Sequence, residues 1–369
     1  MIFSKVLLKG VKGVGTIGLD LIPEKKVYTF IAENGVGKTK LLESLFQIFL
    51  GSHELLTTIT NERYLSELFV LTTAQVDDIR FIFPKSSFSY KCLFNNIKQH
   101  NLPIVYMASQ NRGFIKHQQQ ATKAIGNFSD RRKRYIDSLF QGMQQNFSNL
   151  NMENDIEQWF ITRAQSSNSY QKQADNRVAE LQIVLKLLHQ LDTRIDENFL
   201  EISGDNRVFI DINGNKRQLS QLSTGFASIL KIIQSIVAGY GNFTNEQNLQ
   251  QVKGIVLIDE IESHFHLSWQ AKIIPLLKKL FPNTTFYITT HSSIVLTQLE
   301  EGEAYKLNRE NDGVVRSSPI IAPNKAALID VLKDAFDIDL NKMKRDNMSA
   351  KQQQEAKKKL LDFLIQEET

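Results

Sequence analysis

The segment AENGVGKT, at residues 32–39, decides the fold of this 369-residue chain. An apolar run at 27–31 precedes it, and the helix-like stretch LLESLF at 41–46 follows it. A buried strand, a glycine loop and a helix in this order are the context that a phosphate-binding loop requires. The pattern predicts an α/β protein in which the backbone N–H groups at the start of the helix bind phosphate.

The residues of this loop have separate predicted tasks. Gly35 and Gly37 let the backbone turn its N–H groups inward. The Lys38 ammonium reaches the β- and γ-phosphates, and the Thr39 hydroxyl holds Mg²⁺. Ala32 replaces the first glycine of the GxxxxGK[ST] pattern and, being small, is expected to preserve the loop. The predicted nucleotide contacts are Asn34, Gly35, Val36, Gly37, Lys38, Thr39 and Lys40. The competing interpretation is a glycine-rich helix start that binds nothing.

Two later segments each place acidic or basic groups at the end of an apolar strand. LIDEIE, at 257–262, ends in Asp259, predicted to hold Mg²⁺, and Glu260, predicted to polarise the attacking water. TTHS, at 289–292, delivers His291, whose imidazole is expected to contact the γ-phosphate or that water. The alternatives are a carboxylate pair that caps the next helix and a structural histidine.

A fourth segment, LSTGF at 222–226, begins an amphipathic helix. Ser223 and Thr224 are good N-cap residues, and apolar residues continue from Phe226 at helical spacing. An ordinary capped helix is the simpler interpretation. LSTGF also resembles LSGGQ, the signature of ABC-type ATPases. That resemblance implies a homodimer that forms head to tail on ATP binding, with Ser223 and Gly225 acting on the nucleotide of the partner subunit.

The departures from LSGGQ, Thr224 and Phe226, fit soluble relatives better than transporters. These are the structural-maintenance-of-chromosomes, RecF and overcoming-lysogenization-defect groups. DEIESHFHLSWQ, at 259–270, is similar to the DEPExHLHPxxQ stretch of overcoming-lysogenization-defect ATPases and of ATPase subunits of anti-phage systems such as Septu and PARIS. The resemblance implies an ABC-type P-loop ATPase head, α/β, with a helical insertion. A metal cluster of Glu262, His264 and His266 is the alternative, but the two histidines have no supporting third ligand group nearby.

Composition excludes several classes of protein. Hydrophobic residues make up 42% of the chain, which suffices for a large core. The single cysteine, Cys92, excludes an internal disulfide framework and a cysteine zinc finger. No apolar run approaches the length of a membrane span, so a cytoplasmic protein without membrane contact is expected. The formal charge of +4 is too small to indicate nucleic-acid binding by itself.

The separation between the phosphate loop and the signature exceeds what a compact head needs, which locates the insertion. The expected organisation is an N-terminal lobe at 1–112, a helical insertion at 113–200, a C-terminal lobe at 201–320 and C-terminal helices at 321–369. The insertion is expected to form a stubby arm. Strands are expected at 64–72, 79–84, 103–108 and 303–307, and late helices near 324–336 and 349–367. The residues after His291 are too few for a nuclease domain of the topoisomerase-primase type, so none is expected.

Two features, one in the insertion and one just upstream of it, remain open in function. Arg131, Arg132, Lys133 and Arg134 form a basic run that suits phosphate contact with nucleic acid, an acidic protein partner, or simply a solvated helix face. A strand that ends before Gln110 resembles the Q-loop of ABC-type ATPases, whose glutamine touches Mg²⁺ and water. The alternatives are Arg112 as a phosphate or interface contact and an ordinary exposed loop.

Three functional hypotheses follow for this MgATP site. The first is an ATPase that regulates a separately encoded effector protein, in anti-phage defence. The second is a RecF-like ATPase for DNA repair or DNA-end handling, and the third is an assembly scaffold locked by ATP with little turnover.

Overall fold

The computed structural model describes residues 4–58, 69–77, 79–83, 99–117, 125–152, 156–166, 170, 172 and 175–347. The expected strand at 64–72 lies mostly outside these ranges, as do Cys92 and the expected helix at 349–367. Within the described ranges no helix is both long and apolar enough to cross a membrane.

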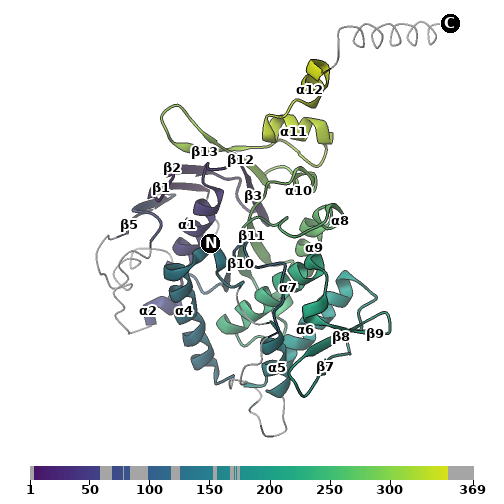
Figure 1. Ribbon diagram of the computed structural model, residues 1–369. Coiled ribbons are helices and arrows are strands. Elements are labelled where there is room, and N and C mark those ends of the chain that lie inside the picture. The colour runs from purple at the N-terminus through teal and green to yellow at the C-terminus, as the bar shows by residue number, and fades with distance from the viewer. Residues whose placement is uncertain are drawn as a thin grey trace, which may run out of the picture.

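A ten-stranded mixed sheet forms the centre of the molecule (Figure 1). Its strands lie in the order β5-β4-β1-β2-β13-β12-β3-β11-β10-β6. Their bounds are β1 Lys5–Val11, β2 Gly15–Asp20, β3 Val27–Ile31, β4 Thr73–Val76, β5 Ile79–Ile82, β6 Ile104–Met107, β10 Gly254–Ile258, β11 Thr284–Thr289, β12 Ala304–Arg309 and β13 Val315–Pro319. A separate antiparallel sheet contains β7 Glu201–Ile202, β8 Val208–Ile212 and β9 Asn215–Gln218.

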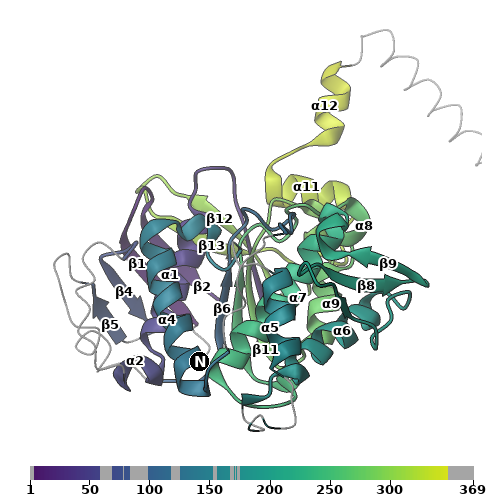
Figure 2. The ribbon, with the colours of Figure 1, turned by 60° about the horizontal axis from the view of Figure 1, so that its bottom comes forward.

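The large sheet has a parallel half and a mostly antiparallel half. β12, β3, β11, β10 and β6 run parallel to one another, whereas β12 pairs antiparallel with β13, and β1 pairs antiparallel with β2 and β4. Every residue of β3, β6 and β10 is buried, as expected for parallel strands that are covered on both faces. Figure 2 shows β4 and β5 at one end of the molecule and β8 and β9 at the other.

Helices cover the parallel half of the sheet. Their bounds are α1 Lys38–Gly51, α2 Glu54–Thr58, α4 Phe128–Gln145, α5 Ile156–Gln165, α6 Val178–Leu191, α7 Thr224–Phe243, α8 Leu267–Gln270, α9 Ile273–Leu280, α10 Ser293–Leu296, α11 Leu328–Phe336 and α12 Leu340–Asn347. α1 packs against β11, β10 and β6, and α7 packs against β6. α7 is almost wholly buried because it lies between the sheet and the helices α4 and α6.

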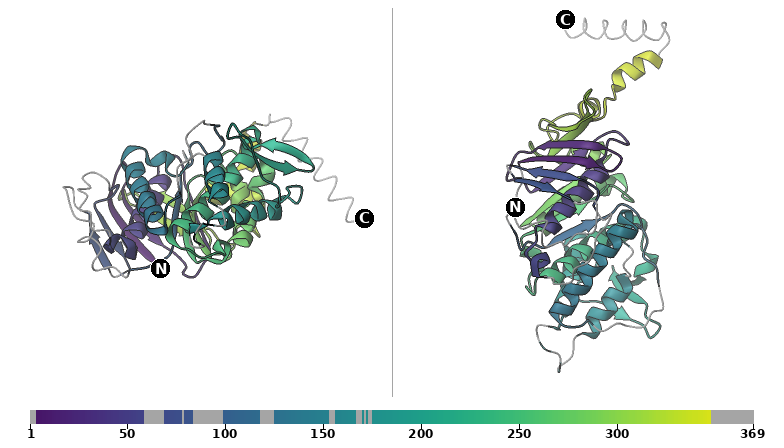
Figure 3. Two further views of the ribbon diagram at one scale, coloured as in Figure 1. Left: turned by 90° about the horizontal axis from the view of Figure 1, so that it is seen from below. Right: turned by 90° about the vertical axis from the view of Figure 1, so that its left-hand side faces the viewer.

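The helices of the insertion form a lobe of the body. α4 and α6 contact α7, and α5 contacts α6. Their apolar residues, such as Leu139, Phe160 and Leu188, belong to the same buried core as the sheet. Both views in Figure 3 show these teal helices packed against the body. The expectation of an arm that stands away from the head is therefore wrong for the described residues, although the proposed boundaries at 113 and 200 stay predictions.

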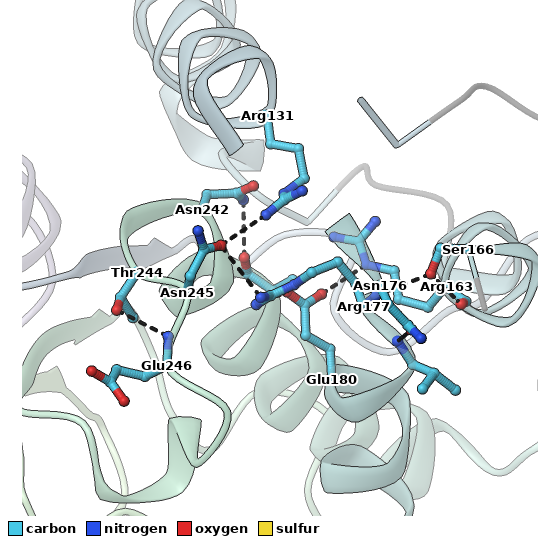
Figure 4. Close-up of polar contacts among 12 residues, drawn as sticks. Arg131, Arg163, Ser166, Asn176, Arg177, Glu180, Asn242, Thr244, Asn245 and Glu246 are labelled. Carbon is cyan, nitrogen blue, oxygen red and sulfur yellow. Dashed lines mark hydrogen bonds and ion pairs between the residues drawn. The ribbon is translucent and has the colours of Figure 1, made fainter. Parts of the chain in front are cut away.

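A buried ion cluster lies where this lobe packs on α7 (Figure 4). The Glu180 carboxylate accepts from Arg163 Nε at 2.7 Å and from Arg177 Nε at 2.7 Å. Gly241 of α7 lies against the carboxylate, and a Cβ at this position would overlap Glu180 Oε1. A hydrogen bond of 3.1 Å from Arg131 Nη2 to Asn245 Oδ1 adds a link from α4 to the end of α7.

The basic run of the sequence is consequently not a free cationic patch. Arg131 is 4% exposed and also donates to the Gly126 carbonyl. Arg132 donates to the Phe243 carbonyl at 3.0 Å and its guanidinium lies 4.2 Å from the centroid of the Phe128 ring. Lys133 and Arg134 are exposed, and Arg134 donates to the carbonyl of Ile125. The solvated-face interpretation is wrong for Arg131, which is buried, and Arg132 is half-buried with its guanidinium bonded to the Phe243 carbonyl.

The C-terminal part of the described chain leaves the sheet through the β12–β13 hairpin. α11 packs against α10, and α12 contacts α11. Figure 1 shows α12, in yellow, standing away from the body. The expected helix near 324–336 corresponds to α11, and the expected strand at 303–307 corresponds to β12.

The close packing at Gly241 generates a stability prediction. In Gly241→Ala the new methyl group displaces the Glu180 carboxylate, which two arginines hold, so urea unfolding should show a loss of about 1–3 kcal/mol. Gly204→Ala is the control, since no atom lies within 4 Å of its added Cβ. A Gly241→Ala protein as stable as the wild type would show that the ion cluster does not hold α6 on α7.

Candidate functional site

Three of the predicted motifs and the loop with Gln110 converge because four neighbouring strands are parallel. β3, β11, β10 and β6 lie side by side in this order and end at the same edge of the sheet. β3 leads into the phosphate loop, β11 into His291, β10 into Asp259 and β6 into Gln110. The carboxyl ends of parallel strands are where open α/β sheets bind ligands. Segments more than two hundred residues apart therefore meet at one place.

The phosphate loop has the backbone shape that its glycines predict. Gly35 and Gly37 have φ values of 82° and 117°, in the region that favours glycine. Gly37 is also the N-cap of α1, and a Cβ there would lie 2.7 Å from Val14 Cγ2. Ala32 has an ordinary conformation and contributes its carbonyl oxygen, so the missing first glycine leaves the loop intact.

Lys38 is held inside the loop. Its ammonium donates to the carbonyls of Ala32 at 2.8 Å and Glu33 at 3.2 Å, and the residue is 7% exposed. Burial lowers the pKa of this amine, while the charges of Asp259, Glu260 and Glu262 oppose the shift. A cation in this position, with only neutral carbonyl partners, can exchange them for phosphate oxygens.

Asp259 occupies the centre of the site. Its carboxylate accepts from Thr39 Oγ1 at 3.0 Å and from Thr289 Oγ1 at 2.6 Å, and the residue is 3% exposed. Burial raises the pKa of Asp259, and the bonds from Thr289 and Thr39 counteract this shift. The hydroxyl of Thr39 and the carboxylate of Asp259 form an oxygen-only donor set that fits Mg²⁺.

Glu260 sits in a strained turn next to Asp259. Its φ is 45°, a left-handed value that is uncommon for a side chain of this size. The Glu260 N–H donates to Thr289 Oγ1 at 2.8 Å, and the carboxylate accepts from Ser263 Oγ at 3.1 Å. The Thr289 hydroxyl thus fixes both acidic residues at once, since it donates to Asp259 and accepts from Glu260.

The His291 segment is tied to the same turn through Glu262. The Glu262 carboxylate accepts from Thr290 Oγ1 and from the His291 N–H, each at 2.6 Å. These bonds place the half-buried His291 at the edge where Asp259 lies. Glu262 is therefore a structural link, and no group of three metal-binding side chains occurs among the described residues, which disfavours the alternative cluster with His264 and His266.

The loop after β6 differs from the expectation at Arg112. Gln110 is exposed and accepts from Ser148 Oγ at 3.3 Å, so its predicted contact with Mg²⁺ stays a prediction. Arg112 is fully buried and donates to backbone carbonyls, which corrects its assignment as a phosphate or interface contact. Gln110 and Asn111 are exposed, so an ordinary exposed loop stays the alternative for Gln110. Lys231 of α7 donates to the Asn111 carbonyl at 2.6 Å, which ties this loop to the signature helix.

The signature segment faces outward at the start of α7. Ser223 is the N-cap, is exposed, and accepts from the Phe226 N–H at 3.4 Å. Gly225 is buried, and a Cβ there would lie 3.5 Å from the His264 carbonyl and 3.7 Å from Trp269 Cδ1. The signature therefore packs on the segment at 259–270, so the two stretches that carried the family resemblance form one surface.

Sequence reasoning missed the chemical tasks of Thr289 and Arg112. Thr289 was recognised only as a strand residue before His291, although a threonine at the end of an otherwise apolar strand is a signal for a buried hydrogen bond. No local signal distinguishes Arg112 from an exposed arginine, because its burial depends on the turn after β10, in a distant part of the chain.

A sheet that brings a phosphate loop, a strand-end acidic pair, a strand-end histidine and an outward signature helix to one edge defines an ABC-like P-loop ATPase head. Residues 33–297 match the family described as “AAA domain, putative AbiEii toxin, Type IV TA system”. The chain belongs to this family.

Two sequence relatives agree with this class. The “Septu protein PtuA” of Bacillus thuringiensis is 24% identical over 343 residues, which cover 86% of this chain and 79% of that protein. The “Retron Ec83 probable ATPase” of Escherichia coli is 36% identical over 119 residues, covering 30% of this chain and only 22% of that protein. A crystal structure of an SmcHead bound to the C-winged helix domain of ScpA aligns with a TM-score of 0.48 at 13% identity, covering 88% of this chain and 99% of that one. The resemblance to ATPases of the Septu kind is confirmed by these sequence relatives.

The bonds of Thr289 generate a prediction for the site. Thr289→Val keeps the shape of the side chain but leaves the Glu260 N–H and the buried Asp259 carboxylate without this partner, so urea unfolding should show a loss of about 1–3 kcal/mol. Thr285→Val, at a half-buried position on the same strand, should change stability by less than about 0.5 kcal/mol. Equal losses in the two variants would contradict the assigned role of the Thr289 hydroxyl.

Proposed function

We propose that this protein binds and hydrolyses MgATP at an interface between two copies arranged head to tail, and that the cycle controls a separately encoded effector in anti-phage defence. The observation that carries the proposal is the contact of Thr39 with Asp259, at 3.0 Å, beneath the opening of the phosphate loop. Residues 220 positions apart meet there with the oxygen ligands that a metal-bound nucleotide needs.

In this proposal, ATP and Mg²⁺ bind to groups of the phosphate loop and to Asp259. Backbone N–H groups from Asn34 to Lys40 receive the phosphates at the positive end of α1. Lys38 exchanges the carbonyls of Ala32 and Glu33 for the β- and γ-phosphate oxygens. When bound, Mg²⁺ neutralises phosphate charge, and Thr39 and Asp259 are the residues that would hold it, with Gln110 as a further contact.

Hydrolysis is assigned to Glu260 and His291. The Glu260 carboxylate lies one residue beyond Asp259 and would orient or deprotonate the attacking water. The Glu260 carboxylate now accepts from Ser263 Oγ, a neutral donor that a water molecule can replace. The His291 imidazole would contact the γ-phosphate, and the Glu262 bond to its backbone N–H fixes where the residue stands.

The site within one chain is incomplete in this proposal. Ser223, Thr224 and the N-terminal end of α7 are exposed, so their N–H groups can face a nucleotide held by a second copy. Ser223 and Gly225 would then stabilise the γ-phosphate from the partner side. Closure on ATP and opening after hydrolysis supply two states that bind an effector differently.

The effector is inferred from the relatives. This chain is similar to a Septu protein over most of both chains. The similarity favours a role in the same kind of defence system, in the cytoplasm and with a protein partner. The engagement of Arg131 and Arg132 inside the lobe weakens the alternative of a RecF-like DNA-handling ATPase, because it removes half of the basic run from the surface.

Steady-state ATP turnover tests the proposal. Lys38→Ala should abolish ATP binding, whereas Glu260→Gln should retain ATP binding and lower kcat on the order of 10²- to 10⁴-fold, since it removes a general base. Glu246→Gln, a substitution at an exposed glutamate, is the matched control and should leave kcat within about twofold. A wild-type protein that binds MgATP without turnover would contradict the hydrolytic function and favour the ATP-locked scaffold.

Affinity capture with ATP-bound Glu260→Gln separates the remaining alternatives. Capture of one stoichiometric protein partner supports effector control. DNA-stimulated turnover that falls with salt, and that is lost when Lys133 and Arg134 are neutralised, would instead support the DNA-handling function.

A further inference from the structure

Arg112 makes its contacts with the backbone of the acidic turn. The residue is 0% exposed and lies in the loop that follows β6. Its Nη1 donates to the Glu260 carbonyl at 3.0 Å, and its Nη2 donates to the Asp259 carbonyl at 2.7 Å. A further bond of 2.8 Å from Nη2 reaches the carbonyl of Ala108, at the end of β6. The guanidinium therefore joins two neighbouring strand ends through three carbonyl oxygens.

The chemistry of arginine suits this position. A planar guanidinium presents parallel donors that span two successive carbonyls, whereas a lysine ammonium is a point donor. Burial lowers the pKa of Arg112 to about 10, and the charges of Asp259, Glu262 and Glu260 oppose the shift. The group stays protonated at neutral pH, so its donors remain available to all three carbonyls.

The turn that Arg112 holds is strained. A left-handed conformation, such as that of Glu260 with φ at 45°, costs roughly 1–2 kcal/mol for a residue with a side chain. Such strain persists only when neighbouring contacts impose it. Arg112 holds the carbonyl side of Glu260, and Thr289 holds its N–H side. The direction of the Glu260 side chain depends on this backbone conformation.

We propose that Arg112 is a positioning residue for ATP hydrolysis, which clamps the Asp259–Glu260 turn so that the Glu260 carboxylate faces the attacking water. This inference rests on the hydrolytic function proposed above. It assigns Arg112 no contact with the nucleotide, so removing the clamp lowers kcat and leaves ATP affinity unchanged.

The test compares Arg112→Lys with Arg177→Lys. Arg177 is also buried and also donates through two nitrogens, but in the ion cluster of the insertion lobe. Both variants should lose thermal stability, while only Arg112→Lys should lower kcat, by about 10- to 100-fold, because a shift of the water-orienting group by about 1 Å has an effect of this size. The dissociation constant for ATP should stay within about twofold in both, which also shows that both are folded.

Two further measurements separate this role from general destabilisation. In the Glu260→Gln background, Arg112→Lys should lower kcat by less than about a further twofold, because Arg112 acts through the Glu260 carboxylate, which this background lacks. Amide hydrogen exchange over residues 259–262 should rise in Arg112→Lys and not in Arg177→Lys, an outcome that needs no turnover.

Three results would overturn the proposal: unchanged kcat in Arg112→Lys, a loss of ATP affinity that matches the loss of kcat, or losses that multiply in the double variant. If Arg112→Lys does not fold, Arg112→Gln, which keeps one amide donor, takes its place in the same comparison. An inactive wild type would reject the hydrolytic function instead, and the exchange experiment would then decide whether Arg112 holds the turn.

Discussion

The buried carboxylate of Asp259 is the interaction on which the rest of the site depends. Taking an ionised carboxylate out of water is costly unless donors surround it. Thr39 and Thr289 supply two hydroxyl bonds, one from the first turn of α1 and one from the end of β11. Because Asp259 and these two partners follow three different strands, the carboxylate forms this network only when β3, β11 and β10 are in register. The site is thus assembled by the sheet, not by any single loop.

The same edge explains how further elements reach the site. β6 lies next to β10, and the loop after β6 brings Arg112 to the carbonyl of Asp259. α7 packs on β6, and its Lys231 donates to the Asn111 carbonyl in the same loop. The insertion lobe in turn packs on α7 through α4 and α6, with Glu180 against Gly241 and Arg131 bonded to Asn245. The lobe and the signature helix are therefore connected to the acidic turn through packed and hydrogen-bonded groups.

The sequence was sufficient where the chemistry is local. The phosphate loop needs glycines, a lysine and a threonine at fixed spacing, and strand-end residues such as Asp259 and His291 follow recognisable apolar runs. It was insufficient where burial decides the role. Helical periodicity predicts the helices of the insertion but not the surface that they cover. It therefore does not distinguish a stubby arm from the compact lobe that packs on α7. Charge alone left three interpretations of the basic run open, whereas the bonds of Arg131 to Asn245 and of Arg132 to Phe243 join residues more than a hundred positions apart. Arg112 likewise acquires its task from the carbonyls of Asp259 and Glu260, in a distant part of the sequence.

The central claim, that each chain holds half of two shared sites, is tested most directly by mixing two inactive variants. Lys38→Ala removes the phosphate loop and Ser223→Arg blocks the exposed signature, so each alone should be inactive. A mixed dimer contains one intact phosphate loop opposite one intact signature, and equal mixing should restore turnover to about a quarter of the wild-type value, because about half of random dimers are mixed and each has one working site. A mixture that stays inactive, or a Ser223→Arg protein with wild-type turnover, would contradict the shared site.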